Sequence, residues 1–175
     1  MKHIEQWIWL PRDKYSNAQN TVFSGFADKT KGNYTVAEFN KEYAFSEKVV
    51  SAELRFSGDT AFQLYCNDSV VATGPACVGG DFIGNETQRE NFYAFETTIK
   101  PNSDVLNFFA RVKMMPVQIC EYSKGCGGFM LSAILTFADG TQKHIFTDDS
   151  WMVRQNRAYK AFDCYDGRIS PDEYT

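Results

Sequence analysis

Two adjacent acidic residues near the end of the chain are candidates for acid–base chemistry. Glycoside hydrolysis requires two carboxyl groups at a suitable separation, and the chain carries Asp148-Asp149 between Thr147 and Ser150. Neighbouring side chains of an extended segment point to opposite faces, so these two carboxylates cannot converge on one bond. We therefore predict that Asp148 or Asp149 stabilises a turn by accepting hydrogen bonds from local backbone N–H groups.

Groups suited to nucleophilic catalysis or phosphate binding are few. The chain has two histidines, His3 and His144, and His144 lies within an alternating segment, where packing is the commoner role. The sequence contains no Gly-x-Ser-x-Gly elbow and no Walker-type loop. The glycines at 125, 127 and 128 precede no helical pattern and so predict no anion site. An independent enzyme would need a second catalytic group, which the sequence does not offer.

One loop region collects oxygen ligands that suit calcium. Asp81 and Glu86 are the candidate metal ligands, with Asn85 and Glu90 nearby, although their spacing is not that of an EF-hand. Calcium is the only cofactor that the sequence suggests. The five cysteines have no regular spacing and two histidines cannot complete a zinc set. The odd number of cysteines favours free thiols in a reducing compartment over a disulfide framework.

Tryptophans offer a different chemistry, the stacking of an indole ring against a sugar. Trp7 and Trp9 point to the same side of an extended segment, and Trp151 follows the acidic pair. Each is a candidate sugar-binding residue, with burial in the core as the alternative. Asn67 and Asp68, at the tip of an expected hairpin, are further candidates.

Composition narrows the classes of partner. The 175 residues include 18 Lys plus Arg and 22 Asp plus Glu, and the net charge is −4. This acidic balance predicts neither a nucleic-acid partner nor an anionic membrane. No apolar leader follows Met1, and no segment approaches the ~18 apolar residues of a membrane span. We expect a cytoplasmic location, with a chain whose leader peptide has been removed as the alternative.

Alternation with a period of two predicts the elements that position these groups. The clearest segment places Val50, Ala52, Leu54 and Phe56 on one face. The same pattern recurs over 37–45, 62–66, 106–112 and 129–137, and no helical period persists for ten residues. Many short strands separated by turns predict an all-β fold, a two-sheet antiparallel β-sandwich of jelly-roll or galactose-binding-like type.

Turns and irregular regions divide the chain. Ala138-Asp139-Gly140-Thr141 predicts a hairpin with positive φ at both central residues and a return strand over 142–147. Long irregular regions cover 12–33, 74–91 and 116–128, where binding residues of a sandwich commonly lie. Alternation fades after Arg154. We therefore predict a sandwich module over 1–153 and an extension over 154–175 leading toward a missing downstream domain.

Several short stretches in order resemble one family. They are Trp7-Ile8-Trp9, residues 37–43, residues 58–68, Val71-Ala72-Thr73-Gly74-Pro75, Ala138-Asp139-Gly140-Thr141 and residues 147–151. Together they resemble the amino-terminal β-sandwich module of bacterial alpha-L-rhamnosidases of glycoside hydrolase family seventy-eight. Asp68 departs from that pattern because it stands where the family has glycine. The resemblance implies a non-catalytic module, since the acids of that family lie in a downstream helical (α/α)6 domain.

Three hypotheses of function follow. The first is a structural and docking module of an alpha-L-rhamnosidase, whose partners are downstream domains of the same polypeptide. The second is a carbohydrate-binding module that recognises a glycan containing rhamnose or a related sugar, with calcium as an aid. The third, an independent enzyme, lacks a catalytic set.

Overall fold

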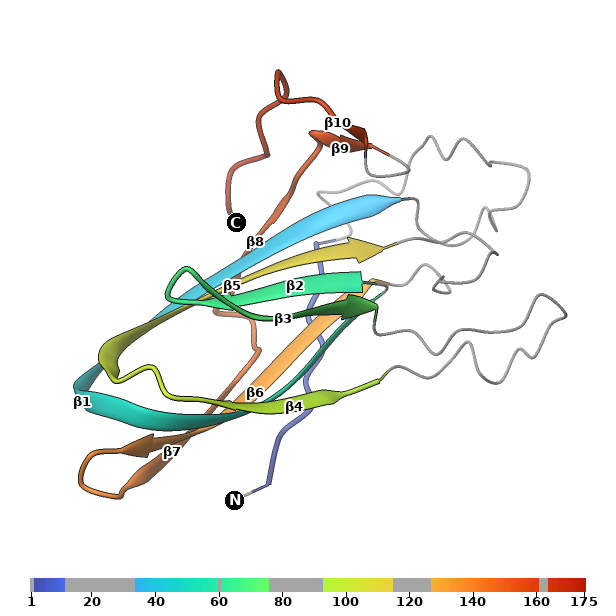
Figure 1. Ribbon diagram of the computed structural model, residues 1–175. Helices are drawn as coiled ribbons and strands as arrows, with labels where there is room; N and C mark the ends of the chain where they lie inside the picture. The colour runs from blue at the N-terminus through green and yellow to red at the C-terminus, as the bar shows by residue number, and fades with distance from the viewer. Residues whose placement is uncertain (1, 12–33, 60, 76–92, 115–126, 161–163) are drawn as a thin grey trace, which may run out of the picture.

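The computed structural model describes residues 2–11, 34–59, 61–75, 93–114, 127–160 and 164–175. Within these ranges all regular elements are strands and their pairing is antiparallel, as the alternation predicts (Figure 1). The strands are β1 (Thr35–Asp59), β2 (Ala61–Cys66), β3 (Ser69–Pro75), β4 (Phe95–Ile99), β5 (Ser103–Met114), β6 (Gly128–Phe137), β7 (Gln142–Phe146), β8 (Met152–Gln155), β9 (Tyr159–Lys160) and β10 (Cys164–Tyr165).

Strand β1 belongs to both layers of a two-sheet antiparallel β-sandwich. Its first part, up to Ala44, pairs with β5 on one side and with β8 on the other. Its last part, from Val49, pairs with β6 and β4. One layer therefore has the order β3-β2-β5-β1-β8, and the other has the order β4-β1-β6-β7. The chain passes between the layers where the β1–β5 register shifts, between Ala44 and Val49.

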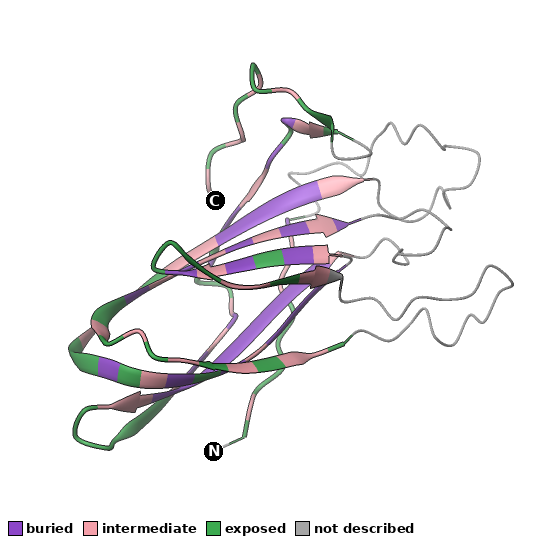
Figure 2. Cartoon of the chain, viewed as in Figure 1, coloured by how far each residue is buried: buried purple, intermediate pink, exposed green. Residues whose placement is uncertain are grey.

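The core lies between the two layers and is rich in aromatic rings. The Phe39 and Phe129 ring centroids are 5.1 Å apart, and those of Phe56 and Phe62 are 5.6 Å apart. Each fully buried phenylalanine contributes about 1.5–3 kcal/mol relative to an exposed one. The predicted inward faces of β2 and β5 are confirmed, and buried positions also run along β1 and β6 (Figure 2).

The predicted inward position of Val50 is wrong by one residue. Val49 is fully buried, whereas Val50 is 36% exposed. The register between β1 and β6 shifts between Val49 and Ser51. An extra residue at such an irregularity moves the preceding side chains to the opposite face. The alternation from Ala52 onward is as predicted.

The prediction of positive φ at both central residues of the 138–141 turn is wrong for Asp139. At the β6–β7 turn Gly140 has a φ of 84°, but Asp139 is not among the described residues with positive φ. Gly140 N donates to Phe137 O at 3.0 Å, which is the pattern of a turn closed by a left-handed glycine. At the β2–β3 turn both central residues are left-handed, with φ of 48° for Asn67 and 62° for Asp68.

Residues 2–11 form an N-terminal strap that lies against β6. Ile8 and Phe129 exchange backbone hydrogen bonds of 2.9 Å, and Ile4 N donates to Ser132 Oγ at 3.2 Å. Arg55 Nε donates to Glu5 Oε1 at 2.8 Å. With the strap in place, β6 is buried on both faces over most of its length, although the sequence predicts alternation there.

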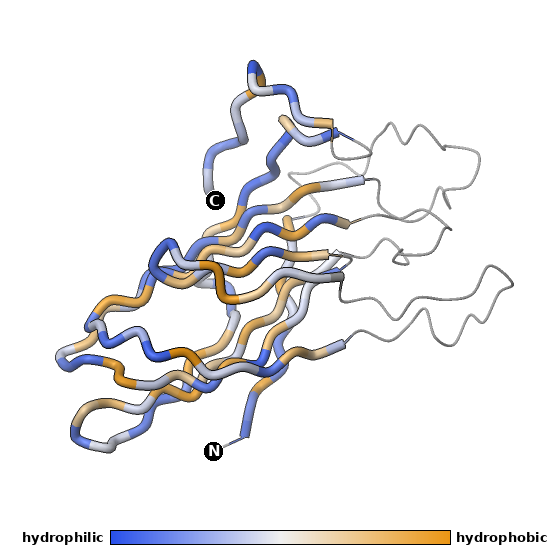
Figure 3. The backbone as a smooth tube through the Cα atoms, in the orientation of Figure 1, coloured by the Kyte–Doolittle hydropathy of each residue, from blue (hydrophilic) through white to orange (hydrophobic). Residues whose placement is uncertain are grey.

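The C-terminal segment, residues 154–160 and 164–175, returns along the β8 edge. Val153 and Thr175 exchange backbone hydrogen bonds of 2.8 and 2.9 Å, and Asn156 N donates to Val36 O at 2.8 Å. Polar residues dominate this segment, and it ends beside β8 (Figures 1 and 3). Residues predicted as an extension therefore pack on the β3-β2-β5-β1-β8 layer, and the downstream domain stays a prediction.

Candidate functional site

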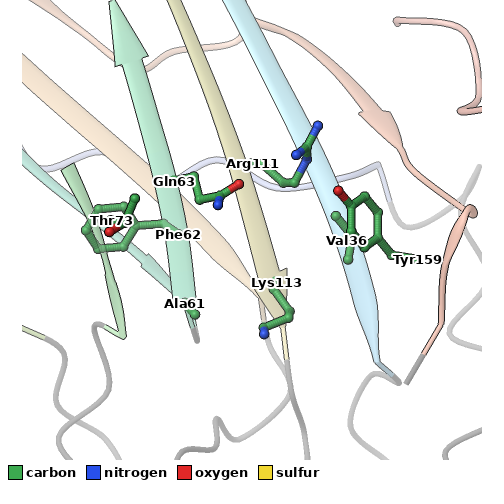
Figure 4. A pocket seen from close by; sticks show the side chains of 8 residues that line it. All are labelled: Val36, Ala61, Phe62, Gln63, Thr73, Arg111, Lys113 and Tyr159. Atoms are coloured by element: carbon green, nitrogen blue, oxygen red, sulfur yellow. The ribbon is translucent and has the colours of Figure 1, made fainter. Parts of the chain in front are cut away.

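A groove crosses the outward face of the β3-β2-β5-β1-β8 layer. Its volume is about 310 Å³. Figure 4 shows the eight side chains that line it: Val36, Ala61, Phe62, Gln63, Thr73, Arg111, Lys113 and Tyr159. Residues directly opposite in adjacent antiparallel strands lie close together. The groove therefore follows from strand register rather than from any contiguous stretch of sequence.

The register places one row of polar residues across the whole layer. Thr73 pairs with Gln63, and Gln63 pairs with Arg111. Arg111 pairs with Glu38, and Glu38 pairs with Arg154. Alternation turns the neighbouring positions, such as Phe62 and Val112, toward the core. The layer thus carries a hydroxyl, an amide and three charged groups on adjacent strands.

Glu38 is the buried centre of this row, with 1% of its surface exposed. Its carboxylate accepts hydrogen bonds from Arg111 Nη2 at 2.8 Å, Arg154 Nε at 2.7 Å and Asn156 Nδ2 at 2.8 Å. Burial acts to raise the pKa of Glu38, but the hydrogen bonds from Asn156, Arg111 and Arg154 together hold it below its ordinary value. Alternation predicts Glu38 on the solvent face. It is buried because the returning C-terminal segment brings Asn156 to it.

Aromatic rings cover both arginines. The Arg111 guanidinium carbon lies 5.2 Å from the Tyr159 ring centroid, and that of Arg154 lies 4.3 Å from the Tyr174 ring centroid. Such contacts contribute about 0.5–2 kcal/mol, depending on desolvation. Tyr159 and Tyr174 both come from the C-terminal segment. Through Tyr159 this segment forms part of the groove wall and covers Arg111.

The predicted tryptophans occupy three different settings. A Cβ on Gly127 would lie 2.1 Å from Trp9, and one on Gly128 would lie 2.6 Å from Trp7, so both indoles sit against this glycine pair. Trp9 also contacts the Phe39 ring, whereas Trp7 is 43% exposed. Trp151 is 5% exposed and packs on Phe129 and Phe108, as its core alternative expects.

The other predicted site residues are not brought together with them. Asn67 holds the hairpin tip, because its side chain donates to Val105 O at 2.9 Å and accepts from Asn107 N at 2.8 Å. Asp68 is exposed at the same tip, at the end of β2 opposite Ala61 and the groove. Asp81 and Glu86 lie outside the described residues, and no group of metal-ligating side chains occurs within them.

A serine between two histidines joins the strap to the β6–β7 hairpin. His3 Nδ1 lies 2.9 Å from Ser132 Oγ, and His144 Nε2 lies 2.7 Å from the same oxygen. Burial, together with the positive charges of His3 and the N-terminus, lowers the pKa of His144. Ser132 is fully buried, and no carboxylate bonds either imidazole within the described part of the chain. The cluster therefore fastens the strap rather than forming a hydrolytic triad.

Within the acidic pair, Asp148 stabilises a turn. Asp148 Oδ1 accepts a hydrogen bond from Ser150 N at 2.9 Å and another from the Ser150 hydroxyl. This is the turn-stabilising role predicted for Asp148, while Asp149 is exposed. Elsewhere Asp59 accepts from Gly127 N at 3.0 Å. These carboxylates support the backbone.

Sequence reasoning did not single out the groove. Gln63, Thr73 and Arg111 stand at outward positions of predicted strands, which read as solvated. The available signal was a polar residue at the outward position of each strand. Only the strand order and register turn those separate positions into one row.

Comparison with solved structures finds carbohydrate-associated proteins. The apo form of the Pleurotus ostreatus lectin matches 96% of this chain and 39% of the lectin chain, with a TM-score of 0.59 and 17% identity. The lectin from Pleurotus ostreatus in complex with GalNAc gives a TM-score of 0.53 at 19% identity, over 96% and 40%. An alpha-L-rhamnosidase from Dictyoglumus thermophilum gives 0.55 at 14% identity, over 99% of this chain and 19% of the enzyme.

At these identities the likeness establishes the fold alone, a lectin-like or rhamnosidase-like β-sandwich. The chain spans about two fifths of the lectin and about a fifth of the rhamnosidase. No protein-family model matches the chain, and no curated protein sequence matches it. Across the described ranges, none of the elements is a helix long and apolar enough to cross a membrane.

Proposed function

We propose that the chain is a non-catalytic carbohydrate-recognition module that binds a saccharide in the groove on the β3-β2-β5-β1-β8 layer. The observation that carries this proposal is the groove itself, an open cavity of about 310 Å³ that combines polar donors with an aromatic wall. Sites for small ligands commonly combine apolar lining with a few placed polar groups.

The lining chemistry suits sugar hydroxyls. The Gln63 amide and the Thr73 hydroxyl both donate and accept, and Arg111 and Lys113 donate only. Ala61 and the Tyr159 ring, both partly exposed, supply apolar surface for the C–H face of a ring. The neighbouring structures support the class, since one is a lectin in complex with GalNAc and another is a rhamnosidase.

The module would belong to a longer carbohydrate-active polypeptide, with an alpha-L-rhamnosidase as the proposed parent. Support comes from the resemblance of the motifs and from the small share of the rhamnosidase that the chain covers. The described carboxylates with assigned partners stabilise turns, the buried ion cluster or surface ion pairs such as that of Glu5 with Arg55. We expect the chain alone to release no p-nitrophenol from an aryl rhamnoside.

Titration of the ¹⁵N-labelled chain with L-rhamnose and with GalNAc, each with and without calcium, tests the proposal. We expect chemical-shift changes at the amide groups of Gln63, Thr73 and Arg111, and weaker sugar binding by the Gln63→Ala variant. Gln142→Ala on β7 is the matched control, since Gln142 is an exposed strand glutamine in the other layer. Shifts elsewhere, or equal effects of the two variants, would contradict binding in the groove.

A second candidate is structural support and docking for a catalytic domain. The specific observation is that Ile4 and Trp7, both on the strap, are each 43% exposed. Apolar side chains that stay accessible beside a packed layer suit contact with another domain. Sedimentation at high concentration tests this candidate. Self-association weakened by Ile4→Ser would support it, and a strictly monomeric chain would count against it.

A further inference from the structure

We propose that the groove selects acidic sugars, with the Arg111 guanidinium binding the carboxylate of a uronic acid. This inference rests on the proposed function, because it assumes that the groove holds a saccharide. It adds the chemical class of the ligand and the residues that discriminate that class from neutral sugars.

The charge of the groove is the first support. Arg111 and Lys113 both line it, and none of the eight lining residues that the structure describes is acidic. The whole chain carries a net charge of −4, so this local sign runs opposite to that of the molecule. A cleft of one charge sign raises the local concentration of ligands of the opposite sign.

The second support is the balance of the ion cluster behind the groove wall. Arg111 and Arg154 share one carboxylate, that of Glu38. Two fixed guanidinium groups against one anion leave one positive charge in excess within this cluster. A second carboxylate, brought by the ligand, would complete the charge pairing without displacing Glu38.

The third support is the orientation of Arg111. Its Nε and Nη2 both donate to Glu38 Oε1, at 2.9 and 2.8 Å, and Nη1 makes no hydrogen bond to the described residues. The Tyr159 and Phe109 rings lie 5.2 and 5.6 Å from the guanidinium carbon. The side chain is therefore held before any ligand arrives, which reduces the entropy cost of binding.

The row across the strands fits a sugar that has a carboxylate at one side and hydroxyls at the other. Arg111, Gln63 and Thr73 stand on three adjacent strands in register. Neighbouring strands are about 4.8 Å apart. One ring lying across this row can present its carboxylate to Arg111 and its hydroxyls to Gln63 and Thr73.

D-Glucuronic acid and D-glucose form a suitable ligand pair because they differ only at C6, a carboxylate against a hydroxymethyl group. We expect the full chain to bind glucuronate at least about tenfold more tightly than glucose in ¹⁵N titrations, with shifts centred on Arg111, Gln63 and Thr73. Salt should weaken glucuronate binding more than glucose binding.

Matched variants assign the effect to the groove. Lys113→Gln should reduce the preference for glucuronate several-fold, whereas Lys143→Gln on β7 should not. Arg111→Lys keeps the charge but loses the planar fork, and should reduce the preference further. If Arg111→Lys does not fold, the comparison of Lys113→Gln with Lys143→Gln decides whether the preference for glucuronate arises in the groove.

Each remaining outcome overturns the inference in a distinguishable way. Equal affinity for glucuronate and glucose, or binding of L-rhamnose or GalNAc alone, overturns acidic-sugar selectivity and leaves sugar recognition standing. If acetate competes for the groove as strongly as glucuronate does, the groove is a general anion site, and the inference of acidic-sugar selectivity is overturned. No binding of any of these sugars overturns both the inference and the proposed function.

Discussion

Glu38 is the residue whose environment differs most from its sequence pattern. It alternates with buried residues and so reads as solvated, yet two arginines and Asn156 enclose it. Such a carboxylate is stabilising mainly because its removal leaves two partly buried guanidinium groups without a counter-charge. Strand register is non-local information, so the sequence alone did not reveal this environment.

We predict that Glu38→Gln lowers the free energy of unfolding by about 3–5 kcal/mol at neutral pH, because Arg111 and Arg154 would then face each other without a carboxylate. The matched control is Glu42→Gln, an exposed residue of the same strand, which should change it by less than about 0.5 kcal/mol. Urea denaturation of both variants measures the difference. Equal losses would contradict a special role for the buried cluster.

The Glu38 effect should also depend on pH. Because folding holds the pKa of Glu38 below its ordinary value, the ionised carboxylate stabilises the fold above that ordinary value. This contribution is lost as pH falls through the lowered pKa. The gap between wild type and Glu38→Gln should therefore be full at neutral pH and shrink on acidification below the ordinary pKa of a glutamate. A gap that stays constant on acidification would argue against an ionised Glu38.

Asp68 lies in a strained backbone position that a glycine would adopt freely. Its φ of 62° follows that of Asn67, at 48°, in the β2–β3 turn. A left-handed conformation costs an L-residue about 1–2 kcal/mol, less for Asn and Asp. Asp68→Gly should therefore raise the melting temperature by a few degrees. Asp139→Gly, at a negative φ and with a lost acceptor for Thr141 N, should lower it.

At the scale of elements, the strap and β6 depend on two glycines. The indoles of Trp7 and Trp9 occupy the space that a Cβ would need at Gly128 and Gly127. The sequence shows Trp7-Ile8-Trp9 and the glycine run at 125–128 as separate features. Their contact is long-range, so periodicity could predict each segment but not their packing.

We predict that Gly128→Ala destabilises the protein by about 1–3 kcal/mol, because the new methyl group would lie 2.6 Å from Trp7. Trp7→Ala should relieve part of this loss, so the double variant should be less destabilised than the sum of the single variants. Thermal unfolding of the four proteins completes the cycle. Strict additivity would mean that the ring and the glycine do not touch in solution.

At the scale of the whole molecule, the sandwich class and the inward faces of β2 and β5 followed from alternation, because one-sided burial imposes a period of two. The crossing of β1 between layers did not follow, because the polar residues 46–48 separate two alternating segments that the pattern predicts as separate strands, whereas the structure joins them in one strand. The return of the C-terminal segment was also missed, because its contacts are polar hydrogen bonds rather than a hydrophobic face.

The shared strand β1 has a consequence for cooperativity. It contributes to both layers, and the core cluster joins residues of both, so neither layer can lose its structure without exposing the inner face of the other. Leu64→Ala in one layer and Leu135→Ala in the other both remove fully buried side chains. Each should lower the free energy of unfolding by about 2–5 kcal/mol.

Because the layers unfold together, both leucine variants should show one unfolding transition with an unchanged denaturant slope. The transitions recorded by fluorescence and by far-UV circular dichroism should coincide. Val70→Ala, an exposed hairpin position, serves as the control and should shift the midpoint little. Two separated transitions in either leucine variant would mean that the layers fold independently. In that case β1 would act as a tether between two sheets, and the groove layer could open while the other layer remains folded.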